Sequence, residues 1–263
     1  MSSLKLIAWL WIGLALIGVG LSLLIPVPPT WTKDAFAFHF PLANSIAYSI
    51  LHIGAAVLFL MGLNAYKENL QRAYRTIVIG IVIVALGIAQ VAVLVAFDLI
   101  NSVWVQSGAV VLPFVIAGMA IYVGVRSIAR QLGIHSPWAQ YRVAIPLVAL
   151  GMIIVMVLPH TTLTIPELNF DISNMIVAFD SVCYLLAALI ALKIRSRVGK
   201  HYVSAMAWLA LGLLASTIIT LTTIVSSLVL GAEYSNYIQD IVVIIGGLIY
   251  LRAGLAFAKT KEV

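Results

Sequence analysis

Residues 75–98 read RTIVIGIVIVALGIAQVAVLVAFD, and this stretch decides the fold class. No residue between Arg75 and Asp98 carries a charge. The run is as long as the roughly 20 apolar residues that a helix needs to cross a bilayer. Runs of similar length and apolarity recur along the whole chain. The sequence therefore predicts an integral membrane protein built only of α-helices.

The overall composition indicates the same class of protein. Of the 263 residues, 63% are hydrophobic and only 9% are charged, and the mean hydropathy is +1.13. A soluble domain carries about a quarter charged residues. The net charge of +6 comes from short basic clusters between apolar runs, which is typical of orientation signals and not of a nucleic-acid groove. We expect the lipid bilayer as a partner and no nucleic acid.

Charged residues and Pro/Gly turns separate the apolar runs from one another. This alternation of apolar runs with charged or turn-forming residues predicts eight transmembrane helices. The connections between them are too short to form a soluble domain. Their expected ranges are 4–25, 42–65, 75–97, 104–126, 142–159, 171–193, 203–229 and 237–258.

The placement of Lys and Arg predicts the orientation. If the N-terminus is cytoplasmic, every Lys and Arg except Lys33 falls on or near the cytoplasmic side. Such asymmetry is typical of short loops in membrane proteins. We therefore predict a multi-pass protein of the cell membrane with both termini in the cytoplasm. The basic connections 67–75 and 193–200 are also candidates for contact with anionic lipid or a cytoplasmic partner.

A weak internal repeat divides the chain into two halves. The segment FPLANSIA at 40–47 aligns without a gap with FDISNMIV at 170–177, and GMAIY at 118–122 matches GGLIY at 246–250. An even number of spans in each half gives a parallel repeat, related by an axis along the membrane normal. We expect two four-helix membrane halves, at residues 1–130 and 131–263.

Two ionisable residues are predicted to lie near the bilayer midplane. At 1.5 Å per residue, His52 lies about 16 Å and Asp180 about 14 Å from the outer ends of their helices. Polar groups at that depth are costly and are candidates for function. A His–Asp pair there could relay protons or hold a cationic solute.

Further polar residues share this depth. Gln90 lies in the third predicted helix, and the repeat offset pairs it with Thr220 in the seventh. Helical spacing adds a tyrosine one turn from each ionisable residue, at Tyr48 and Tyr184. The predicted binding site comprises His52, Asp180, Gln90, Thr220, Tyr48 and Tyr184. A purely structural role stays open, since interhelical hydrogen bonds in membranes stabilise by about 1–2 kcal/mol.

Motifs that carry catalysis or cofactors are missing from the sequence. It contains no His-Glu-x-x-His, no Gly-x-Ser-x-Gly and no Gly-rich phosphate loop. We predict no catalytic residue, no metal site and no cofactor, which favours a protein that is not an enzyme. Haem needs two facing histidines, and the best matched pair, His39 and His160, lies at the outer surface.

Three functions remain open on this evidence. The first is a small-solute or proton-coupled transporter with a polar midplane site. The second is a non-catalytic membrane subunit or sensory module that packs against other membrane subunits of a larger complex. The third is a haem- or quinone-binding redox subunit, because the four-plus-four plan resembles, in topology alone, the quinone-binding membrane subunits of polysulfide-reductase-type oxidoreductases.

Overall fold

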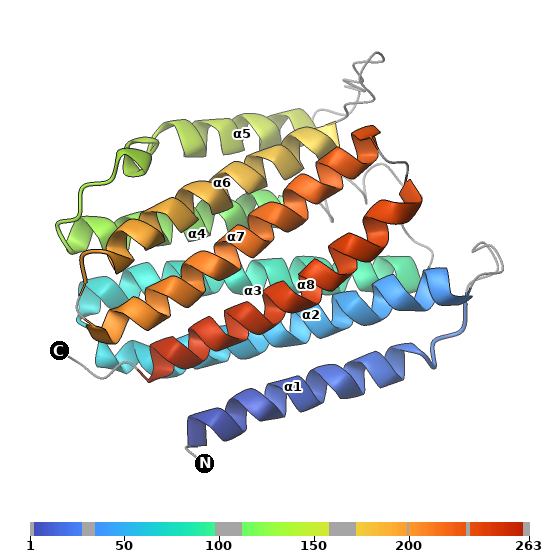
Figure 1. Ribbon diagram of the computed structural model, residues 1–263. Helices are drawn as coiled ribbons and strands as arrows, with labels where there is room; N and C mark the ends of the chain where they lie inside the picture. Colours follow the sequence, from blue (N-terminus) through green and yellow to red (C-terminus); the bar gives the residue numbers. More distant parts are fainter. Residues whose placement is uncertain are drawn as a thin grey trace.

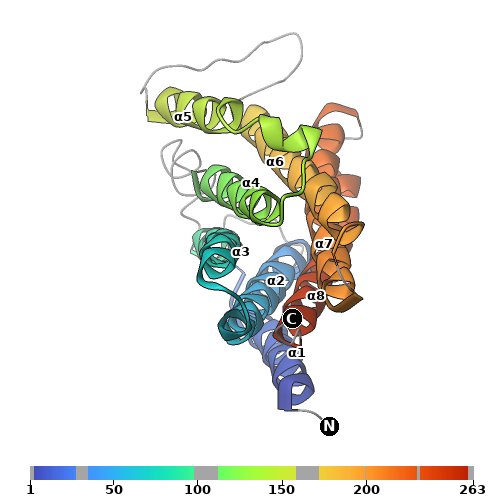
Figure 2. The ribbon, with the colours of Figure 1, turned by 90° about the vertical axis from the view of Figure 1, so that its left-hand side faces the viewer.

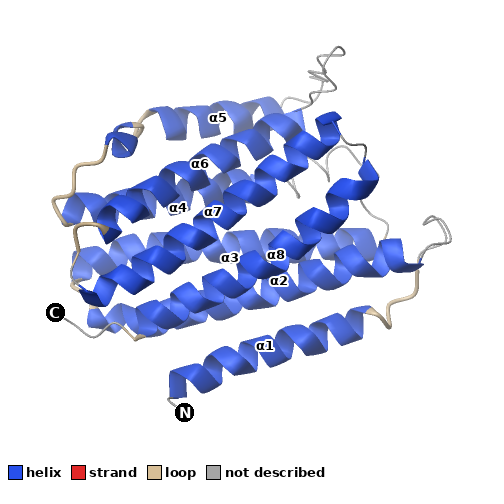
Figure 3. Cartoon of the chain, in the orientation of Figure 1, coloured by secondary structure: helices blue, strands red, loops and turns tan. Residues whose placement is uncertain are grey.

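The computed structural model describes residues 3–27, 35–97, 112–157, 172–198, 200–229 and 232–259, and every regular element within them is a helix (Figure 3). The predicted all-α class is therefore confirmed, with no strand in the described ranges. The helices are α1 Ser3–Ser22, α2 Ala35–Gly62, η1 Leu63–Ala65, α3 Glu68–Ala96, α4 Leu112–Gln131, η3 Pro137–Gln140, α5 Ala144–Val157, α6 Ile172–Arg195, α7 Lys200–Val229 and α8 Ala232–Ala258.

Six of the described helices are long and apolar enough to cross a membrane. These are α1, α3, α4, α7, α8 and the Leu42–Gly62 part of α2. Their outward faces expose large apolar side chains, such as Leu16 of α1 at 68% and Leu86 of α3 at 57% exposed. Lipid tails accommodate such surfaces, whereas a soluble monomer rarely exposes them over a large area. These are the features of a helical membrane protein.

Several helices extend further than the apolar runs indicated. The helix α2 begins at Ala35 and runs through Pro41, and α3 begins at Glu68 and not at residue 75. Hydropathy counts only the apolar part of a helix, whereas backbone hydrogen bonding continues into the polar flanks. The carboxylate of Glu68 in the first turn of α3 also favours an early start. The expected helix segment 104–111 lies outside the described residues.

The helices pack as a ring with two peripheral members. Around the ring, α2 packs against α3, α3 against α4, α4 against α6, α6 against α7, α7 against α8, and α8 against α2. The helix α1 lies outside against α2 and α8, and α5 lies outside against α4 and α6 (Figures 1 and 2). The ring encloses an interior that is shielded from the lipid-facing surface.

Both described ends of the chain lie at one end of the bundle (Figure 1), which we call the basic end. The described Lys and Arg residues all lie in its connections or within about two helical turns of it. One consequence is that the pKa of Lys259 is lowered, first by burial and then by the positive charges of Lys5 and Arg252. The basic end thus gathers positive charge from separate helices.

Glycines allow close approach of helix backbones in the ring. A Cβ atom on Gly254 of α8 would lie 2.7 Å from the carbonyl oxygen of Ala55 in α2. A Cβ on Gly124 of α4 would lie 2.9 Å from the carbonyl oxygen of Ala73 in α3. Small residues at such crossings let membrane helices make extensive van der Waals contact.

The end of α4 is closed by a Schellman motif. Gly133 has a φ of +65°, its N–H donates to the carbonyl of Arg130 over 3.1 Å, and the N–H of Ile134 donates to that of Ala129 over 2.8 Å. The chain then turns back over its own helix. There the Nε of Arg126 donates to the carbonyl of Ala139 over 2.8 Å.

Gly133→Ala is expected to lower the free energy of unfolding by about 1 kcal/mol, because an L side chain is disfavoured at positive φ. The measurement is unfolding of the purified protein in mild detergent by titration with a denaturing detergent. Gly20→Ala is the control, because a Cβ at that helical position meets nothing within 4 Å. An equal loss of stability in both variants would contradict the role of the left-handed turn.

Candidate functional site

Buried and partly buried polar side chains meet inside the helix ring, on the inward faces of α2, α6, α7 and α8. We call this set the interior polar cluster. Its members are Tyr48, His52, Asp180, Ser181, Tyr184, Ser216, Thr220 and Tyr250.

His52 lies at the centre of the membrane-spanning part of α2 and is only 1% exposed. Its Nδ1 lies 3.0 Å from the carbonyl oxygen of Tyr48. Because a carbonyl only accepts hydrogen bonds, Nδ1 carries the hydrogen. In the neutral ring Nε2 is then an acceptor, and this buried atom has no hydrogen-bond partner. The imidazole packs between Tyr48 and Tyr250, with ring centroids 3.8 and 4.7 Å away.

Asp180 of α6 is 2% exposed. Its carboxyl group accepts a hydrogen bond from the hydroxyl of Tyr184, one helical turn further along. The other carboxyl oxygen, Oδ1, is buried and has no partner. It lies against Gly118 of α4, in space that any larger residue at 118 would occupy. The glycine therefore makes room for the carboxyl group.

Hydroxyl groups of α7 connect the cluster across helices. The Ser216 Oγ lies 3.1 Å from the Tyr250 hydroxyl of α8, and either atom can donate. Ser216 also hydrogen-bonds with the Tyr48 hydroxyl of α2. On the α6 side, Ser181 Oγ donates to Thr220 Oγ1 over 2.5 Å. The helices α2, α6, α7 and α8 are thus connected through side-chain hydroxyls.

His52 and Asp180 are neighbours of the same two tyrosines but are not paired with each other. The carboxyl of Asp180 interacts electrostatically with the hydroxyls of Tyr48 and Tyr250, whose rings contact the imidazole of His52. Within the described residues, no hydrogen bond or ion pair joins His52 to Asp180 directly. The two tyrosines are therefore the groups that border both.

The structure brings together five of the six predicted site residues. His52, Tyr48, Asp180 and Tyr184 lie in the cluster, and Thr220 joins it through Ser181. The sixth residue does not reach it.

Gln90 is an exposed residue of α3 and lies apart from the cluster. The buried face of α3 presents Ile77, Ile81, Val84 and Ala85 instead. Depth in the membrane depends on position along a helix, whereas facing depends on rotation about its axis. The repeat offset that paired Gln90 with Thr220 predicts only the first of these.

Four residues of the site were not predicted as site residues from the sequence. They are Tyr250, Ser181, Ser216 and Gly118. A signal for two of them was present, because Gly118 and Tyr250 belong to the repeated segments GMAIY and GGLIY. Their roles differ between the halves, however. Tyr122, the counterpart of Tyr250, donates its hydroxyl to the carbonyl of Trp138 over 2.9 Å and is not part of the cluster.

The interior is polar toward one end and aromatic toward the other. Asn44, at helical spacing from Tyr48 and His52, is buried and its Nδ2 has no hydrogen-bond partner. On the basic side of His52 the rings of Phe59 and Phe257 pack with centroids 4.5 Å apart, and Tyr74 lies 5.0 Å from Phe257. A polar face of α2 therefore leads from the end opposite the basic end to His52, with aromatic side chains beyond it.

No protein-family model, curated protein or solved structure matches this chain. The described residues also contain no group of three His, Cys, Asp or Glu placed to hold a metal ion.

Proposed function

We propose that the chain is a proton-coupled transporter of a small polar solute, and that the interior polar cluster binds the proton and the solute. The observation that carries this proposal is the presence of two unpaired, buried polar atoms in one cluster, His52 Nε2 and Asp180 Oδ1. Membrane helices rarely bury such groups without a partner, because each one costs free energy.

The chemistry of the two atoms indicates what satisfies them. A charged side chain near the bilayer centre costs about 2.5–3.5 kcal/mol on insertion scales. A proton on Asp180 removes that charge, and a solute that carries hydrogen-bond donors satisfies Nε2 of His52. Proton binding and solute binding at neighbouring groups are then coupled, because each changes the free energy of the other.

The packing pattern supports a proposed plan of eight spans in two parallel repeats, at residues 1–130 and 131–263. If four is added to each helix number, counting on from α8 to α1, every helix–helix contact described above becomes another contact that the structure contains. For example, α1 against α2 and α8 corresponds to α5 against α6 and α4 (Figure 2). Transporters built from repeats carry their sites at the repeat interface, where α2 meets α8 and α4 meets α6.

We also propose that the basic end faces the cytoplasm in the cell membrane, as the positive-inside rule indicates. The buried polar face of Asn44, Tyr48 and His52 then lies in the outer half of α2. The aromatic side chains of Phe59, Tyr74 and Phe257 close the interior on the cytoplasmic side. This order of polar and aromatic side chains favours entry of the solute from the outer side.

The test is proton flux in liposomes that contain the purified protein, with an imposed pH gradient and a pH-sensitive dye inside. The wild-type protein is expected to dissipate the gradient faster than empty liposomes do. Asp180→Asn, which keeps the shape but cannot release a proton, is expected to slow that flux by about tenfold or more, because positioned acid–base groups contribute at least that factor.

Ser49→Ala is the matched control, since Ser49 is equally buried on α2 but donates to the Ser45 carbonyl of its own helix. Its flux should equal that of the wild-type protein. Equal flux in the wild-type and Asp180→Asn proteins would overturn the proposal. A wild-type protein without flux that co-purifies with another membrane subunit would instead favour the subunit function.

A further inference from the structure

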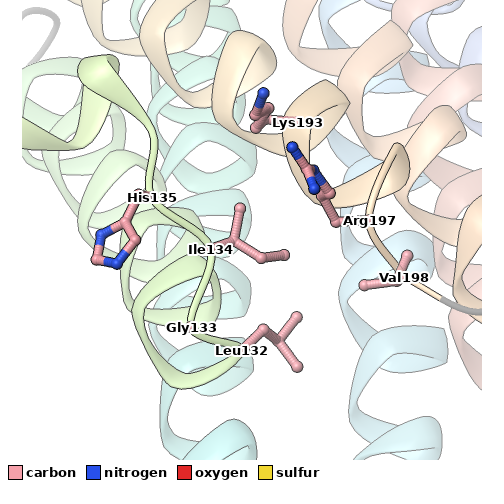
Figure 4. A pocket seen from close by; sticks show the side chains of 7 residues that line it. All are labelled: Leu132, Gly133, Ile134, His135, Lys193, Arg197 and Val198. Carbon is pink, nitrogen blue, oxygen red and sulfur yellow. The ribbon is translucent and has the colours of Figure 1, made fainter.

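Two cavities flank the α4–α5 connection at the basic end. One, of about 560 Å³, lies between that connection and the end of α6, where Leu132–His135 face Lys193 and Arg197–Val198 (Figure 4). The other, of about 470 Å³, lies between the connection and α4 and includes Arg126 and Arg130. Both are lined by Gly133, Ile134 and His135, so the two cavities border the same short segment.

The charged side chains among the described residues that line these cavities are all basic. Lys193 and Arg197 are one helical turn apart, and Figure 4 shows their charged ends close together on one wall of the larger cavity. Among the described residues, no Asp or Glu lines either cavity. The described residues contain the ion pair Arg72–Glu68, and neither of its residues lines a cavity. Like charges at this spacing repel each other, so an anion placed between them is attracted by both.

The walls of the cavities are held in place by the backbone. The Schellman motif at Gly133 fixes the direction in which the chain leaves α4, and Ile134 packs on the hydrophobic core. The Nε of Arg126 is bonded to the Ala139 carbonyl, which orients the guanidinium and leaves its Nη groups as donors. The connection that forms one wall of the larger cavity therefore has a defined path, and the exposed side chains of Lys193 and Arg197 form the wall that faces it.

We propose that the larger cavity binds a phosphate group through Lys193 and Arg197. Guanidinium and ammonium groups are the side chains that recognise phosphate, the former through two parallel hydrogen bonds. The cavity lies where the helices leave the apolar region, which is the depth of lipid headgroups. The phosphate is that of an anionic phospholipid headgroup or of a soluble phosphate compound, and the following experiment separates these two sources.

The experiment measures ligand binding to the purified full chain in mild detergent by native mass spectrometry and by thermal unfolding. The probes are phosphatidylglycerol, phosphatidylcholine, and inorganic phosphate against chloride at equal ionic strength. The variant is Lys193→Gln/Arg197→Gln. The control, Arg75→Gln/Arg195→Gln, removes the same charge from exposed residues of this end that do not line the cavity.

We expect the wild-type protein to retain phosphatidylglycerol in preference to phosphatidylcholine. The affinity should fall about tenfold or more in the cavity variant, since two basic contacts are lost, and by less than twofold in the control. If inorganic phosphate, and not the lipid, stabilises the wild-type protein with the same dependence on Lys193 and Arg197, the source is a soluble compound. Equal losses in both variants, or no preference for either probe, would overturn the proposal.

Discussion

Gly254→Leu is expected to destabilise the protein by about 3 kcal/mol, the upper end of the usual range for overpacking a close-packed interior. The first atom of the new side chain would lie 2.7 Å from the Ala55 carbonyl oxygen and 3.0 Å from the Leu58 Cβ. A backbone oxygen cannot rotate away, so α8 must move away from α2. That movement also separates Phe257 from Phe59 and opens the basic side of the interior.

The free energy of unfolding in a denaturing-detergent titration measures this effect. Gly20→Leu on the peripheral helix α1 is the control, because a Cβ at Gly20 meets nothing within 4 Å. It introduces the same side chain and the same gain in helix propensity, about 1 kcal/mol relative to Gly. If Gly254→Leu is as stable as Gly20→Leu, the close packing of α2 against α8 is contradicted.

Gly118→Ala is expected to slow proton flux by about tenfold or more, while all polar residues of the cluster stay unchanged. The added methyl group would overlap Asp180 Oδ1 and would lie 3.2 Å from the Cβ of Cys183. The carboxyl must rotate to another position, which separates it from its hydrogen-bond partner Tyr184. Flux in liposomes should therefore fall as far as it does in Asp180→Asn.

Gly246→Ala is a closely matched control for Gly118→Ala. The two glycines are equivalent in the proposed repeat, but a Cβ at Gly246 makes ordinary contacts of 3.4 Å to Ile219, 3.8 Å to Ala215 and 4.0 Å to Tyr48. Its flux and stability should equal those of the wild-type protein. If Gly118→Ala retains full flux while Gly246→Ala does not, the position of the Asp180 carboxyl group does not determine the function.

The sequence indicated His52 and Asp180 as candidates, but it did not indicate all of the groups that surround them. His52 and Asp180 stood out because an ionisable residue in an apolar run is visible in the sequence itself. Tyr48 and Tyr250 border both of these residues. This arrangement depends on the contact between α2 and α8, which are far apart in the chain. Gln90 illustrates the same limit. Its position along the helix could be predicted from the sequence, but the outward direction of its side chain could not.

The 22-residue uncharged run within residues 75–98, and others like it, determined the class of protein by themselves. Transfer into a bilayer depends on local composition and length, which need no knowledge of neighbouring helices. Tertiary structure alone decided that α1 and α5 lie outside a ring, that Gly118 accommodates the carboxyl of Asp180, and that Lys193 and Arg197 face a cavity. These features depend on which helix faces meet, and in a chain that is apolar on nearly every face, packing rather than hydropathy selects those faces.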